Sequence, residues 1–113
     1  MNPLVTVVIP LYNCEEYIEE CVLSVLKQDY TPIEIIVVDD ASTDGSVAKI
    51  AEYPVCISRN TINVGECKTS ERGFGLAGGK YICRLSCDDI FVNSNHFFYF
   101  IYINIHDLIY MCD

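Results

Sequence analysis

Basic side chains are scarce in this sequence, and the imbalance excludes one class of partner. The 113 residues include 7 Lys and Arg against 16 Asp and Glu, for a formal net charge of −9. Nucleic acids bind to basic surfaces that displace their counterions, so we predict no nucleic-acid partner. A small anion stays compatible with the charge, because a metal ion or local backbone amides can outweigh it.

Signals for export, zinc binding and membrane insertion are also missing. Seven cysteines form no CxxC pair and are odd in number, so we expect free thiols in a reducing cytosol. Cys83 and Cys87 fit alternate positions of one strand better than a redox or metal pair. No basic segment opens the chain as in a signal peptide. The apolar run 97–105 covers about half of a bilayer-spanning helix, so we predict no transmembrane segment.

Strand-like and helix-like segments alternate through most of the chain. Asn13 and Glu16 have the spacing of a capping box, which predicts the start of the first helix. The order βαβαβαβ with short connections predicts an α/β fold with three layers, α/β/α, around a mainly parallel sheet. The apolar runs predict strands over residues 4–9, 33–38, 55–57 and 81–85. Apolar stripes and caps predict helices over about 13–28, 42–52 and 66–77.

The composition changes after residue 90. Residues 91–113 contain no Lys, Arg, Glu, Gly or Pro and are rich in Phe, Tyr, Ile and Asn. We therefore predict one domain over 1–90 and an atypical tail over 91–113. Apolar segments with few charges promote association, so self-association through this tail is a further expectation.

Polar residues follow the predicted strands at the point where each strand ends. In open α/β sheets, ligands bind outside these carboxyl ends. Asp39 and Asp40 end an otherwise apolar strand, and paired like charges are costly unless a ligand or cation takes up one of them. The alternative is that one carboxylate caps the next helix and the other is solvated.

A second acidic pair, Asp88 and Asp89, follows the last predicted strand. Carboxylate oxygens suit Mg²⁺ or Mn²⁺, which bind through one or two carboxylates together with ligand phosphates. Such a metal cation would lie between a negatively charged diphosphate and this negatively charged protein, and would allow the two to bind. The alternative is an acidic turn with no ligand, which the pair by itself would allow.

Several segments resemble family 2 glycosyltransferases, whose fold is called GT-A. The strings VTVVIPLYNCEEYIEECVLSVLKQ and IEIIVVDDASTDGS are followed by NVG, GKYI and RLSCDDI, the last resembling the DxD segment of the family. The resemblance covers about residues 4–90, the N-terminal half of the family pattern. It implies part of a GT-A fold, which is Rossmann-like, with strand order 3-2-1-4. It also implies a site for a nucleotide-diphospho-sugar, usually a UDP-sugar.

The resemblance also assigns residues to the two ends of that ligand. Pro10 and Tyr12 would flank the nucleoside base, Asp40 would accept a hydrogen bond from the base imide, and Asp39 would support that loop. Asp88 would hold Mg²⁺ or Mn²⁺ on the diphosphate.

Asp89 would lie beside that metal ligand, and Ser86 stands where the DxD segment usually has its first Asp. The metal would neutralise charge that builds on the departing nucleoside diphosphate.

A full-length member of the family transfers the sugar to an acceptor, commonly a polysaccharide or lipid-linked precursor. The resemblance puts the general base beyond residue 113, so no catalytic residue is assigned, and we expect this chain to bind the donor at most. The change at residue 91 is interpreted as the mark of a truncated or frame-shifted gene product, or of a fragment. The expected location is the cytoplasm, with a peripheral position at the inner face of the membrane as an alternative.

Two other functions are alternatives to donor binding. The first is a non-catalytic remnant without a ligand. The second is a receiver-like signalling domain that binds Mg²⁺, but a receiver has its Asp pair after the first strand, where this sequence has residues 10–13.

Overall fold

The computed structural model describes residues 2–92, and the predicted elements are all found there. The expectations for residues 93–113, including self-association, lie outside the described part. Among the described helices, none is long and apolar enough to cross a bilayer. The elements are β1 (Val5–Leu11), α1 (Ile18–Leu26), β2 (Ile33–Asp39), α2 (Ser46–Ile50), β3 (Cys56–Arg59), α3 (Glu66–Leu76) and β4 (Tyr81–Arg84).

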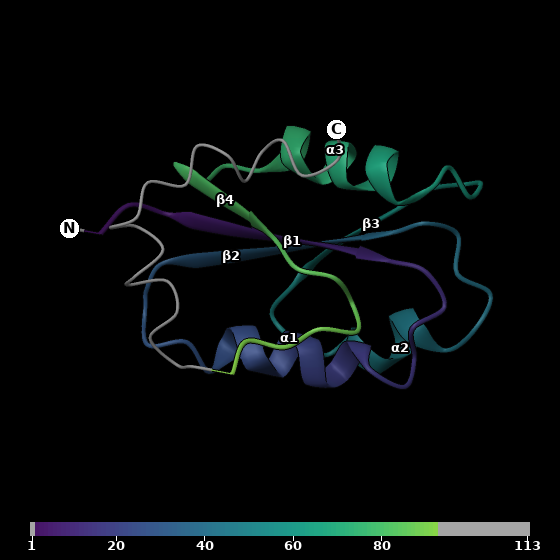
Figure 1. The fold of residues 1–113 in the computed structure, drawn as a ribbon, viewed down its shortest axis with the longest axis horizontal. Helices are drawn as coiled ribbons and strands as arrows, with labels where there is room; N and C mark the ends of the chain where they lie inside the picture. Colours follow the sequence, from purple (N-terminus) through teal and green to yellow (C-terminus); the bar gives the residue numbers. More distant parts are fainter. Residues whose placement is uncertain (1, 93–113) are drawn as a thin grey trace.

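The four strands form one parallel sheet in the order β3-β2-β1-β4. The predicted fold class and strand order are therefore confirmed. Helix α3 covers one face of the sheet, and α1 and α2 cover the other, which gives the three layers (Figure 1). Because all strands run the same way, the loops that follow them gather at one edge of the sheet.

The core lies mainly between the sheet and α1. Strand β1 is buried at every position, as expected for a strand covered on both faces. Its alternate side chains point towards α1, whose apolar stripe repeats at the helical period. The fully buried side chains of this layer in β1 and α1 are Val5, Val7, Ile9, Leu11, Ile18, Cys21, Val22 and Val25.

The other face of the sheet receives α3 at very close range. A methyl group built on Gly73 would lie 2.3 Å from Cγ1 of Val8 and 3.3 Å from Cγ2 of Val38. Only a residue without a side chain allows the helix backbone to approach β1 and β2 this closely. This contact sets the distance between α3 and the sheet, and the first turn of α3 contributes to the site described below.

The predicted capping box at the first helix is wrong. Helix α1 begins at Ile18, and its N-cap, Tyr17, makes no side-chain capping bond. Asn13 adopts a φ of 46°. Its Oδ1 instead accepts hydrogen bonds from the backbone N–H of Thr43 at 2.8 Å and of Asp44 at 3.3 Å. Its amide oxygen therefore joins the loop after β1 to the loop after β2.

The predicted position of Cys87 on a strand is also wrong. Strand β4 ends at Arg84, so Cys83 lies in the strand, buried, whereas Cys87 belongs to the following loop.

Candidate functional site

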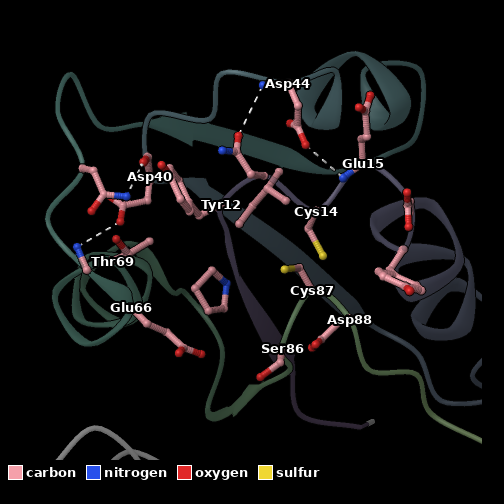
Figure 2. A pocket seen from close by; sticks show the side chains of 17 residues that line it. Tyr12, Cys14, Glu15, Asp40, Asp44, Glu66, Thr69, Ser86, Cys87 and Asp88 are labelled. Carbon is pink, nitrogen blue, oxygen red and sulfur yellow. Dashed lines mark hydrogen bonds between the residues drawn. The ribbon is translucent and has the colours of Figure 1, made fainter.

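A cavity of 810 Å³ opens at the carboxyl ends of the strands (Figure 2). The loops after β1, β2 and β4 and the beginning of α3 form its walls. Its lining side chains are those of Pro10, Leu11, Tyr12, Asn13, Cys14, Glu15, Glu16, Tyr17, Asp40, Asp44, Asn63, Gly65, Glu66, Thr69, Ser86, Cys87 and Asp88.

The cavity is strongly acidic. Six of its lining side chains are carboxylates, and none of these lining residues is basic. An anionic ligand would therefore need either backbone N–H groups or a cation to enter. The carboxylates are Glu15, Glu16, Asp40, Asp44, Glu66 and Asp88.

Asp40 lies directly after β2 and is 3% exposed. Its Oδ1 accepts hydrogen bonds from Asn60 Nδ2 at 2.9 Å and the Val64 N–H at 2.8 Å. Its Oδ2 accepts the Gly65 N–H at 2.9 Å. Burial raises the pKa of Asp40, but the bonds from Asn60, Val64 and Gly65 outweigh burial and lower it. The carboxylate thus fixes the segment that leads into α3 while it borders the cavity.

Asp39 does not line the cavity. It is fully buried, and its Oδ2 lies 3.0 Å from Arg59 Nε and accepts the Ser42 N–H at 3.2 Å. Its Oδ1 is buried without a hydrogen-bond partner in the described part of the chain. The alternative in which one carboxylate of the pair is solvated is therefore wrong, since Asp40 is buried too.

Pro10 and Tyr12 come from the end of β1 and the loop after it, and both line the cavity. Pro10 is buried, whereas the side chain of Tyr12 is 49% exposed. An aromatic ring that is half-exposed at a cavity wall offers a face on which a planar group can stack.

The loop after β4 contributes Ser86, Cys87 and Asp88 to the cavity. It turns back on itself, because the Asp89 N–H donates to the Ser86 carbonyl at 3.0 Å. The thiol of Cys21 on α1 donates to the same carbonyl at 3.5 Å. Asp89 is exposed and does not line the cavity, so the structure brings only one carboxylate of the second acidic pair into it.

This donor set fits a hard cation only in part. Within residues 2–92, no group of three or more His, Cys, Asp or Glu side chains is arranged to hold a metal. The Asp88 carboxylate and the Ser86 hydroxyl would supply two oxygen donors. Mg²⁺ and Mn²⁺ commonly use one or two carboxylates and complete their coordination with ligand phosphates and water. The residues therefore suit a cation that a phosphate ligand brings in and shares.

Three polar residues and a thiol line the cavity although they are not among the predicted site residues. Asn63, Glu66 and Thr69 lie at or just before the start of α3, and Cys14 lies before α1. The Asn-Val-Gly segment at 63–65 was the available signal, because Gly65 has a φ of 96° and ends the loop that Asp40 binds.

Acid is expected to weaken the fold through Asp40. Because the pKa of Asp40 is lower in the folded chain than its unfolded value of about 3.9, the carboxylate stabilises the fold above about pH 4. This contribution is lost as the pH falls through the folded pKa, with a slope of up to about 1.4 kcal/mol per pH unit for one proton. Urea unfolding between about pH 3 and pH 6 measures it. The slope should be shallower in Asp40→Asn, and equal slopes in both proteins would contradict the assignment.

A family model described as Glycosyl transferase family 2 matches residues 6–94. Among similar proteins, glycosyltransferase GlyG of Streptococcus pneumoniae is 38% identical over 95 residues, which are 80% of this chain and 32% of GlyG. The putative teichuronic acid biosynthesis glycosyltransferase TuaG of Bacillus subtilis is 37% identical over 93 residues, 78% of this chain and 37% of TuaG. This chain thus spans about a third of the length of these relatives.

Solved structures are similar over the same region. TarS 1–349 of S. aureus in complex with UDP-GlcNAc superimposes with a TM-score of 0.81 at 28% identity, covering 87% of this chain and 30% of that one. The mannosyltransferase PcManGT of Pyrobaculum calidifontis, in complex with GDP-Man and Mn²⁺, gives a TM-score of 0.74 at 26% identity, covering 83% of this chain and 30% of that one.

Proposed function

Because the chain belongs to glycosyl transferase family 2, we propose that its cavity binds the nucleoside diphosphate part of a sugar donor. The observation that carries the proposal is the convergence of Asp40 and Asp88 on one cavity. They follow β2 and β4, which lie on either side of β1 in the sheet. A ligand that uses both residues would extend along the carboxyl edge across β1.

In this proposal the nucleoside base occupies the side formed by β1 and β2. Tyr12 offers its half-exposed ring for stacking, and Pro10 provides a rigid apolar wall. Asp40 Oδ2 accepts a hydrogen bond from the Gly65 N–H, and a carboxylate oxygen can accept a further one from a base imide N–H. The complexes of TarS with UDP and UDP-GlcNAc support uracil as the base.

The diphosphate would lie on the β4 side. A divalent cation, Mg²⁺ or Mn²⁺, would neutralise the phosphates, which the six carboxylates of the cavity would otherwise repel. Asp88 and Ser86 would hold it, with Asp89 beside them in the chain but outside the cavity. The presence of Mn²⁺ with GDP-Man in the PcManGT structure supports this choice of metal.

This chain matches about a third of the length of its relatives. Sugar transfer itself is proposed to need residues that the relatives have outside that third. In the transfer, an acceptor hydroxyl oxygen forms a bond to the anomeric carbon, the bond to the diphosphate breaks, and a base removes the hydroxyl proton. None of the side chains in residues 2–92 is assigned the role of this general base. We therefore propose residues 1–90 as a donor-binding unit that shows little or no transfer alone. A polysaccharide or lipid-linked acceptor is proposed for the whole protein, and the name of TuaG supports a polysaccharide.

Calorimetric titration of UDP with and without Mn²⁺ tests donor binding. We expect binding that requires Mn²⁺ and that weakens by about tenfold or more in Asp88→Asn, because the negative charge of a metal ligand is lost. Glu71→Gln is the matched control, since it removes an exposed carboxylate on α3 outside the cavity and should leave the affinity unchanged.

Circular dichroism establishes that each variant is folded. Failure of the folded wild-type protein to bind UDP with Mn²⁺ would contradict the proposal and favour a remnant without a ligand. An equal loss of affinity in Glu71→Gln would show that general charge, and not Asp88, carries the effect.

A further inference from the structure

Two cysteine thiols meet at the wall of the cavity. Cys14 lies in the loop after β1 and is buried, whereas Cys87 lies in the loop after β4 and is partly exposed. Their sulfur atoms face each other (Figure 2), and Cys87 adds to the effect of burial in raising the pKa of the Cys14 thiol. Residues 73 positions apart in the chain are thereby in contact through their sulfurs.

The backbone on both sides of this contact is held in place. The Cys14 N–H donates to Ser46 Oγ at 2.8 Å, which ties it to the start of α2. On the other side, the Leu85 N–H donates to the Val8 carbonyl at 2.9 Å. The two thiols therefore stay near each other because the surrounding secondary structure positions them.

The other described cysteines are placed differently. The thiols of Cys21 and Cys83 donate to the carbonyl oxygens of Ser86 and Arg84. Cys56 and Cys67 are exposed, on β3 and α3 respectively. Cys14 and Cys87 are the two that line the cavity.

We propose that Cys14 and Cys87 form an oxidisable dithiol, a modification site that closes to a disulfide in response to a small-molecule disulfide such as oxidised glutathione. This proposal does not depend on donor binding. Cys87, the more exposed thiol, attacks one sulfur of the oxidant and releases one small thiol. Burial raises the pKa of the Cys14 thiol well above its usual range, so the loss of its proton to solvent is the slow step. The Cys14 thiolate then attacks the Cys87 sulfur of the mixed disulfide, forms the protein disulfide and releases the second small thiol. Two protein thiols lose two electrons and two protons, and one small disulfide becomes two small thiols.

Closure would join the loop of Tyr12 to the loop of Asp88, which border the same cavity. In a reducing cytosol such bonds are transient and report oxidation, so the pair would act as a reversible switch. Oxidation would fix the relative position of two walls that are otherwise connected by hydrogen bonds.

Mass spectrometry of the full chain, incubated with oxidised glutathione, tests the proposal. Digestion with trypsin, Glu-C and Asp-N separates Cys14 from Cys21, and Cys87 from Cys83 and Cys112. We expect a linked peptide pair containing Cys14 and Cys87, a mass loss of about 2 Da at that pair, and full reversal by dithiothreitol. In Cys14→Ser, Cys87 should keep the mixed disulfide with glutathione, because the second thiol is missing.

Cys21→Ser is the control, since it removes a neighbouring buried thiol and should leave the linked pair unchanged. A dominant link between Cys21 and Cys87, or a mixed disulfide on Cys87 that persists in the wild-type protein, would overturn the proposal. Absence of any linked pair while exposed Cys56 is glutathionylated would overturn it as well, because the oxidant would then have been effective.

Discussion

Asp40→Ala is expected to lower the free energy of unfolding by about 3–5 kcal/mol, because charged groups make hydrogen bonds worth about 1.5–3 kcal/mol each. Asp40 accepts such bonds from Asn60, Val64 and Gly65. Without the carboxylate, these N–H groups lose their acceptor, and the side chain that donates from Asn60 is buried. Urea unfolding at neutral pH measures the change.

Two further variants distinguish the hydrogen bonds of Asp40 from its charge. Asp40→Asn keeps one acceptor oxygen but places its NH₂ group against the Gly65 N–H, where two donors meet. It should lower the free energy of unfolding by about 1–3 kcal/mol, which is less than the loss in Asp40→Ala. Asp89→Ala removes an exposed carboxylate and should stay within about 0.5 kcal/mol of the wild type. A loss below about 1 kcal/mol in Asp40→Ala would contradict the anchoring role.

Gly73→Val is expected to destabilise the fold by about 3 kcal/mol or more, since overpacking of a dense core costs 1–3 kcal/mol even for small additions. The first added carbon alone would lie 2.3 Å from Val8 Cγ1. Val8 cannot yield easily, because it is fully buried in the central strand and β-branched side chains are stiff. Helix α3 would have to move away from the sheet, which displaces the loop that Asp40 holds. Urea unfolding with circular dichroism detection measures the loss.

Gly75 provides the matched control on the same helix. A side chain at Gly75 meets nothing within 4 Å, so Gly75→Val should change the stability by less than about 0.5 kcal/mol. If Gly73→Val does not fold, Gly73→Ala gives a graded effect, and Val8→Ala in the same chain should recover part of the loss by making space. Equal effects at both glycines would contradict the packing argument.

The sequence pattern predicted the fold well, because its signals are local. Each strand is an apolar run that ends at polar residues, and α1 carries an apolar stripe at the helical period. The resemblance added the strand order, which apolar patterns alone do not specify. Four of the six residues assigned to the ligand, Pro10, Tyr12, Asp40 and Asp88, line one cavity.

The interactions between loops could not be predicted in the same way. Asn13 followed by Glu16 reads as a local cap, yet the amide of Asn13 bonds residues that are 30 and 31 positions away. The partner of Asp39 depends on strand register, since β2 and β3 pair Asp39 with Arg59. No spacing rule connects Cys14 with Cys87, because their contact arises only when β1 and β4 lie side by side.

The hydrogen bonds between the loops after β1 and β2 have a consequence for how the chain can vary. The Asn13 N–H donates to Ser42 Oγ, the Asn13 side chain binds Thr43 and Asp44, and the Gly45 N–H donates to Glu15 at 3.1 Å. Each bond joins one loop to the other, so their lengths are interdependent. Exposed loops usually tolerate insertions, but one added residue in either of these would shift every later partner out of register. We therefore expect related sequences to carry insertions in other surface loops but not in the loop after β1 or in the loop after β2.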